Sequence, residues 1–254
     1  MQTIALCNQK GGVGKTTTAL TLTAGLSAKG FKTLLIDLDP QRNASTTLGH
    51  AQADTPTSLE VLMNEASISD ALLSTPIGAD LVRAGKGLAL VDLYLNGADK
   101  YIRLKEALKP LSRKYDYCII DCPPSLGTLT INGISASNYV IVPAICDLFS
   151  GYGITDLAQT IEEVKRSSNK RVKVLGVLLT QYDPRTNLSK DMIEVLEAVT
   201  KALDTELFES TIRASVKAKE LQLKSQGLFK YAPRHGLTKD YESFVSEVIR
   251  KTKG

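Results

Sequence analysis

The chain carries the stretch Lys10-Gly11-Gly12-Val13-Gly14-Lys15-Thr16-Thr17 near its N-terminus, and this stretch decides the fold class. An apolar run over residues 3–7 precedes it, and a helical pattern over residues 18–29 follows it. A strand, a glycine-rich turn and a helix start form the context in which Gly-Lys-Ser/Thr indicates a phosphate-binding loop. Glycines let successive N–H groups turn toward an anion, and the helix adds the positive end of its dipole. The stretch therefore predicts a nucleotide site.

Each part of this loop has an expected role. We predict that residues 10–17 line the phosphates of a bound nucleotide, with Lys15 reaching the β- and γ-phosphates. The hydroxyl of Thr16 would hold Mg²⁺, a cation that prefers oxygen ligands. The alternative is a plain turn before a helix, which does not require the Gly-Lys-Thr ending found here.

The loop departs from the usual pattern at its entrance. The pattern G-x-x-x-x-G-K-S/T would place a glycine where this chain has Gln9, and an additional lysine, Lys10, follows. The turn makes it hard for the ammonium groups of Lys10 and Lys15 to meet on the same phosphates. We therefore hypothesise that Lys10 points outward to a nucleotide held by a second copy of the chain. There it would neutralise transition-state charge, as an arginine finger does.

Two more apolar runs end in carboxylates. Residues 32–36 lead into Asp37-Leu38-Asp39-Pro40-Gln41, and residues 117–120 lead into Asp121. Unbroken apolar runs are typical of strands buried on both faces of a parallel sheet. Ligands bind at the carboxyl edge of such a sheet, so these acids are expected beside the phosphate-binding loop.

The acids have distinct expected roles. Asp121 would hold a Mg²⁺-bound water opposite Thr16. One member of the pair Asp37 and Asp39 would contact another Mg²⁺-bound water, which makes Asp37 a candidate metal residue through water. The other member would face the attacking water or a lysine. The alternative reading of this pair is two solvated aspartates in the turn before Pro40.

Strand-like and helical patterns alternate along the whole chain. Further strands are expected at residues 80–84, 139–144 and 172–180, and further helices at 57–71, 99–111, 155–166, 187–203 and 238–251. Such alternation is typical of an α/β fold with a doubly wound, mainly parallel sheet flanked by helices. We predict one domain over residues 1–254.

The positive charge is concentrated in the C-terminal part. Residues 1–150 carry 13 basic and 13 acidic side chains, whereas residues 151–254 carry 18 basic and 14 acidic ones. Residues 210–239 contain seven of these cations and one acid, with few aromatic side chains. This composition favours contact with the phosphates of duplex DNA over base stacking. A solvated basic surface without a partner is the alternative.

Several classes of protein are disfavoured. The four cysteines form no Cys-x-x-Cys pair, which favours buried reduced thiols in a cytosolic protein over a metal site. An apolar strand begins almost at Met1, so no signal peptide is expected, and no apolar run approaches the ~20 residues of a membrane helix. We therefore expect a cytoplasmic protein without a membrane partner.

The motifs together resemble those of a known family. KGGVGKTT, LLIDLDPQ and IIDCPPS resemble the ParA/Soj/MinD group of P-loop ATPases with a deviant Walker A loop. Within that group, NQKGGVGKTTT, DLDPQ, DCPPSLG and LLTQYDPRTN are most similar to ParA/Soj chromosome or plasmid partition ATPases. The resemblance implies an ATPase that binds ATP and Mg²⁺ and forms an ATP-dependent sandwich homodimer.

The resemblance also implies partners and residue roles. The dimer would bind duplex DNA without sequence preference, and a ParB/Spo0J-like protein would stimulate hydrolysis and so release the DNA from a nucleoid-associated protein. Lys10 would act across the dimer, and Asp39 would position the attacking water. Arg185 and the basic residues after Ile212 become candidate DNA contacts, namely Arg213, Lys217, Lys219 and Lys224. A MinD-like ATPase at the membrane is the alternative, but it would need an amphipathic tail that the last residues do not supply.

Overall fold

The computed structural model describes residues 1–147, 150–185 and 187–253. Within these residues, seven strands form one sheet in the order β3-β4-β2-β5-β1-β6-β7. The strands are β1 Gln2–Leu6, β2 Thr33–Asp37, β3 Leu72–Ser74, β4 Asp80–Val82, β5 Tyr117–Asp121, β6 Tyr139–Ala144 and β7 Lys173–Leu179. Neighbouring strands run parallel except β3, which pairs antiparallel with β4 at the sheet edge. The predicted α/β class is confirmed.

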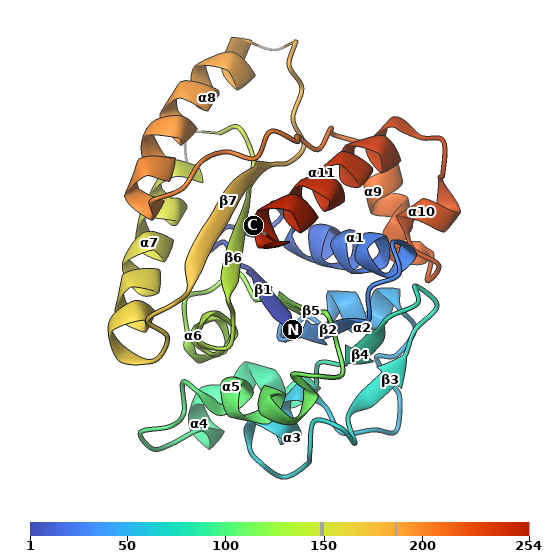
Figure 1. Ribbon diagram of the computed structural model, residues 1–254, viewed down its shortest axis with the longest axis vertical. Coiled ribbons are helices and arrows are strands. Elements are labelled where there is room, and N and C mark those ends of the chain that lie inside the picture. Colours follow the sequence, from blue (N-terminus) through green and yellow to red (C-terminus); the bar gives the residue numbers. More distant parts are fainter. Residues whose placement is uncertain (148–149, 186, 254) are drawn as a thin grey trace.

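Helices cover both faces of this sheet (Figure 1). The α-helices are α1 Lys15–Ala28, α2 Asn43–Thr47, α3 Ser58–Leu62, α4 Val91–Tyr94, α5 Arg103–Leu108, α6 Thr128–Ser135, α7 Ser150–Ser167, α8 Asn187–Thr200, α9 Val216–Glu220, α10 Leu228–Tyr231 and α11 Gly236–Lys253. The described residues also form short 3₁₀ helices, namely η1 Lys86–Leu90, η2 Lys109–Leu111, η3 Lys201–Leu203 and η4 Leu221–Leu223. Helices α1 and α11 pack on one face, and α5, α6 and α7 pack on the other.

The interior strand β1, between β5 and β6, shows how the apolar runs make two cores. Ile4 and Leu6 are buried with α1 and α11, whereas Ala5 belongs to the core that α5, α6 and α7 cover. Successive side chains of a strand point to opposite faces, so an unbroken apolar run suits a strand covered on both sides. The sheet is therefore packed on both faces where the phosphate-binding loop leaves it.

Helices α1 and α11 approach closely at a glycine. A Cβ atom on Gly25 of α1 would lie 2.6 Å from Cγ2 of Val245 in α11 and 3.0 Å from the ring of Phe229. Such a contact is shorter than van der Waals packing allows, so the glycine sets the distance between the two helices. The long C-terminal helix thereby covers the helix that follows the phosphate-binding loop.

Two predicted helices are shorter than expected. Helix α3 begins after a capping box formed by Thr57 and Glu60, but it ends at Leu62 and not at residue 71. Asn64 has a φ of 59°, a left-handed conformation that interrupts a helix. Helix α5 begins at Arg103 and not at residue 99. Local apolar spacing did not reveal either boundary.

Candidate nucleotide-binding site

The phosphate-binding loop joins β1 to α1 and is shaped by two glycines. Gly12 has a φ of 75° and Gly14 a φ of 84°, values that favour glycine. Gly14 lies at the N-terminal end of the 14-residue helix α1, and no side chain caps that end. The first N–H groups of the helix therefore remain available to an anion at its positive dipole end.

The two residues directly after β7 form hydrogen bonds to the loop. The Thr180 hydroxyl donates to the carbonyl of Val13 at 2.8 Å, and the Gln181 amide donates to the carbonyl of Gly12 at 2.7 Å. Both bonds take up carbonyl groups of the loop, so they do not compete with a ligand for the loop N–H groups. Sequence reasoning missed these two supports, because only their position directly after an apolar strand could have indicated them.

The two lysines of the loop are both held within the chain. Lys15 is buried, and its ammonium group donates to the carbonyl of Lys10 at 3.0 Å. Burial lowers the pKa of Lys15, while the negative charges of Asp121 and Asp39 oppose that shift. The ammonium group of Lys10 forms an ion pair with Asp147, in the segment after β6. In this single chain Lys10 therefore points to its own Asp147.

Asp37 has donors for both of its oxygens. It is fully buried at the end of β2, where Oδ2 accepts from the N–H and hydroxyl of Ser45 at 2.9 and 2.7 Å. Its Oδ1 accepts from the N–H of Asp39 at 3.1 Å. Burial raises the pKa of Asp37 to about 6, although the bonds from Ser45 oppose the rise. Asp37 thus fastens α2 to the sheet, and its role toward Mg²⁺ through water stays a prediction.

Asp121 is placed to meet a cation. It ends β5, is fully buried, and neither of its oxygens accepts a hydrogen bond with good geometry from the described residues. Burial and the charges of Asp37 and Asp39 raise its pKa, while Thr16 and Lys15 oppose the rise. A buried carboxylate without donors is costly unless a cation or its water shell reaches it. The pair Thr16 and Asp121 therefore fits a hydrated Mg²⁺.

Asp39 lies in the turn just beyond β2. Only 6% of it is exposed, and its Oδ1 accepts from the N–H of Gln41 at 2.9 Å. Its Oδ2 accepts no hydrogen bond from the described residues. This oxygen can therefore serve a water molecule, although the predicted catalytic role stays a prediction.

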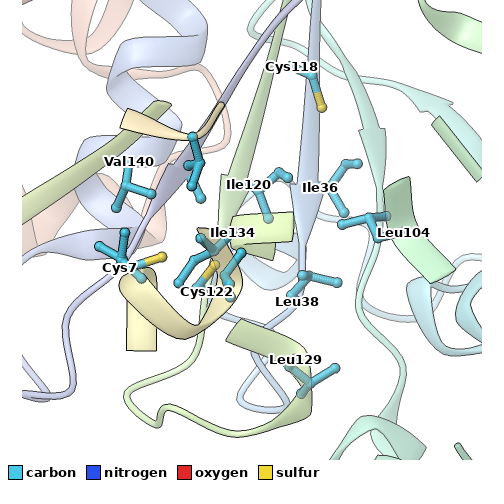
Figure 2. Close-up of a cluster of buried hydrophobic side chains, with 14 of the residues drawn as sticks. Cys7, Ile36, Leu38, Leu104, Cys118, Ile120, Cys122, Leu129, Ile134 and Val140 are labelled. Atoms are coloured by element: carbon cyan, nitrogen blue, oxygen red, sulfur yellow. The ribbon is translucent and has the colours of Figure 1, made fainter. Parts of the chain in front are cut away.

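Buried apolar side chains and two cysteines pack beside these acids. Figure 2 shows Cys7, directly after β1, and Cys122, directly after β5, with their side chains pointing toward one another. The thiol of Cys7 and burial together raise the pKa of Cys122. Both cysteines are free and buried, as expected for reduced thiols that act as packing groups.

The candidate DNA contacts fall into two groups. Arg185 is 86% exposed and pairs with the nearby Asp183 at 2.7 Å, while Lys219 and Lys224 are also exposed. Arg213 forms a two-pronged pair with Asp240 at 2.6 and 2.8 Å, and its guanidinium group covers Gly236. Lys217 pairs with Glu220 at 2.6 Å and contacts the Tyr231 hydroxyl.

Comparison with known proteins finds a matching domain family and similar proteins. A family model described as an AAA domain matches residues 1–174. The sporulation initiation inhibitor protein Soj of Bacillus subtilis is 38% identical over 96% of this chain and 97% of its own. The chromosome partitioning protein ParA of Caulobacter vibrioides is 38% identical over 100% of this chain and 96% of its own.

A solved structure shares the whole architecture. Cobyrinic acid a,c-diamide synthase from Mycobacterium smegmatis, with bound ATP analog and magnesium, matches with a TM-score of 0.87 and 35% identity. The match covers 100% of this chain and 96% of that one. Among the described residues, no helix combines the length and apolarity needed to cross a bilayer.

Proposed function

Because this chain belongs to the family of chromosome-partitioning ATPases that includes Soj and ParA, we propose that it segregates DNA by an ATP-dependent cycle. The ATP-bound chain forms a sandwich dimer, and the dimer binds duplex DNA without sequence preference. A ParB-like protein stimulates hydrolysis, which returns the chain to a monomer that releases DNA. MinD-like positioning at a membrane is the alternative that the experiments below separate.

The observation that carries the ATPase site is the buried Asp121, whose oxygens accept no hydrogen bond with good geometry from the described residues. It lies beside a phosphate-binding loop whose helix N-terminus has no side-chain cap. Bound Mg²⁺–ATP would supply the γ-phosphoryl group that is hydrolysed. Its phosphates would supply negative charge to the loop, and its Mg²⁺ would supply positive charge to Asp121. Lys15 already lies inside the loop, so exchanging the carbonyl of Lys10 for a phosphate oxygen needs only a side-chain movement. The hydroxyl of Thr16 would hold the cation, and Asp121 would hold a water bound to it.

The remaining residues act on the water and across the dimer. Asp39 orients the attacking water with its Oδ2, since its Oδ1 is already held by the turn. Lys10 contributes its charge to the nucleotide of the partner subunit. The exposed cations Arg185, Lys219 and Lys224 neutralise DNA phosphates, a contact that fixes position but reads no sequence.

Duplex DNA binding and molecular mass test the proposal together. Binding should require ATP, should be lost with ADP, and should weaken steeply as salt rises, because counterions are released. ATP should also double the mass in solution. Salt-insensitive binding, or no ATP dependence, would contradict the DNA role, and ATP-dependent sedimentation with anionic liposomes would favour the membrane alternative.

Two substitutions test the residue roles. Lys15→Ala should abolish nucleotide binding, whereas Asp39→Ala should preserve ATP binding and dimerisation but stop turnover. Asp54→Ala, which removes an exposed carboxylate elsewhere, serves as the control and should turn over as the unmodified chain does. Normal turnover by Asp39→Ala would show that Asp39 does not position the water.

A further inference from the structure

Arg42 has a left-handed backbone, a conformation that favours glycine. Its φ is 57° and its ψ is 32°, and it directly precedes α2. In a residue with a Cβ atom, this conformation brings the side chain too close to the following carbonyl oxygen, which makes the folded state less stable. Strain of this kind is concentrated at functional sites, so an arginine in a place that suits glycine points to a role for its side chain.

Hydrogen bonds on both sides hold this conformation in place. The N–H of Arg42 donates to the carbonyl of Asp39 at 2.8 Å, and its own carbonyl accepts from the N–H of Thr46 at 2.8 Å. Ser45 donates to the carboxylate of Asp37 and so fastens α2 to the end of β2. The turn therefore fixes Arg42 beside Asp39, at the carboxyl edge of the sheet where the phosphate-binding loop lies.

The guanidinium group of Arg42 has no hydrogen-bond or ion-pair partner among the described residues. Arg42, Arg83 and Arg103 are the half-buried arginines of residues 1–147, 150–185 and 187–253. Arg83 donates to Thr55 and Arg103 donates to Asp99, whereas no such contact involves the side chain of Arg42. A guanidinium group has five N–H donors in a fork that matches phosphate oxygens. A half-buried one without a partner therefore fits an oxyanion.

The carboxylate of the same turn does not pair with Arg42. The Oδ1 of Asp39 accepts from the N–H of Gln41, and its Oδ2 accepts no hydrogen bond from the described residues. The turn thus presents a cation and a carboxylate oxygen that are not paired with each other. Phosphoryl transfer to water needs both groups, because a carboxylate can orient the water while a cation stabilises the phosphoryl oxygens.

We propose that Arg42 binds the γ-phosphate of the nucleotide held by its own chain and stabilises the charge that develops there during hydrolysis. This inference rests on the proposed function, which places ATP in the phosphate-binding loop. In that reaction the water oxygen bonds to the γ-phosphorus, and the bridging oxygen of the leaving ADP takes the electron pair of the broken bond. One water proton stays on the released phosphate and the other passes to solvent. The strain at Arg42 accompanies this contact and disappears when glycine replaces the arginine.

The first test measures melting temperatures without nucleotide. Arg42→Gly relieves the left-handed backbone and should raise the melting temperature by about 1–4 °C. Arg42→Ala keeps a Cβ atom on that backbone and should not raise it. Asn64→Gly is the matched control, because Asn64 is exposed at the end of α3 and has a φ of 59°. A lower melting temperature in Arg42→Gly would show that the arginine supports the fold, and it would overturn the inference.

The second test compares the affinities for fluorescent ADP and for a fluorescent, slowly hydrolysed ATP analogue, which differ by the γ-phosphate. It uses a Lys10→Ala background, which lacks the proposed contact across the dimer. Arg42→Gly and Arg42→Ala should bind the analogue about 10- to 100-fold more weakly, because a hydrogen bond to a charged group is lost. Their ADP affinity should not change. Arg42→Lys should lose less, since it keeps the charge but not the fork. Asn64→Gly should bind both nucleotides as its parent does.

Turnover at saturating ATP tests the effect on the transition state. Arg42→Ala should hydrolyse ATP at least about 100-fold more slowly in the chain that retains Lys10, and Asn64→Gly should hydrolyse it at the normal rate. If the unmodified chain binds and hydrolyses ATP while Arg42→Ala matches it in both, or loses ADP and analogue equally, the role of Arg42 is overturned and the proposed function stands. If the unmodified chain neither binds nor hydrolyses ATP, the proposed function fails, and the role of Arg42 fails with it.

Discussion

Asp37 and Asp121 are directly opposite partners at the ends of the neighbouring parallel strands β2 and β5, and both are fully buried. Their surroundings differ completely. Asp37 accepts three hydrogen bonds from Ser45 and Asp39, whereas Asp121 accepts none with good geometry from the described residues. The bonds of Asp37 fasten α2 to the sheet, whereas the surroundings of Asp121 are those that its predicted role toward a cation requires.

The free energy of unfolding should decrease as the pH rises through the titration of Asp37. Its pKa is about 6 in the folded chain and near 4 when unfolded, so the folded state binds the extra proton between these values. The unfolding free energy should therefore fall by up to about 3 kcal/mol between pH 4 and pH 6. Urea unfolding at several pH values measures this, and Asp37→Asn should flatten the slope. An equal slope in Asp37→Asn would show that Asp37 is not the group responsible.

Asp121→Asn should have opposite effects on the empty and the loaded chain. Replacing a buried carboxyl group that accepts no well-placed hydrogen bond from the described residues should raise the melting temperature of the nucleotide-free protein. The same change should weaken Mg²⁺ binding in the presence of nucleotide by about 10- to 100-fold. Thermal shift assays with Mg²⁺ titration measure both. A lower melting temperature without nucleotide would mean that Asp121 is structural.

Gly25→Ala should destabilise the chain although alanine favours helices. The helix gains about 1 kcal/mol from alanine, but the added Cβ would collide with Val245 and Phe229, and overpacking costs about 1–3 kcal/mol. Lys239→Ala, at an exposed position of α11, is the control and should change stability by less than about 0.5 kcal/mol. Chemical denaturation compares the two, and a stabilised Gly25→Ala would show that the helices can move apart.

Arg185→Ala and Arg213→Ala should separate DNA contact from structure. Among the described residues, Arg185 pairs within its own exposed loop, so its removal should leave the melting temperature unchanged and reduce the salt slope of DNA binding by about 1. Arg213 ties residue 213 to Asp240 of α11, so its removal should lower the melting temperature by about 1–3 °C. An unchanged salt slope in Arg185→Ala would remove Arg185 from the DNA surface.

Much of the fold could be predicted because its signals are local. The apolar runs of β2, β5, β6 and β7 and the pattern of α1 occur within short windows of sequence, and the structure has each of them. Helix α3 was predicted too long because apolar spacing continued past Asn64, whose left-handed backbone ends the helix. Spacing reports burial but does not report backbone conformation.

The features of the candidate site also divide into those that the local sequence predicts and those that it does not. The sequence alone determined that a phosphate-binding loop follows β1 and that carboxylates end β2 and β5, because strand, turn and helix start are consecutive. Only the tertiary structure decided which aspartate has donors, since Ser45 reaches Asp37 from α2. It also decided that Thr180 supports the loop and that Asp147 holds Lys10. These partners come together only when separate strands align, and no local pattern records that alignment.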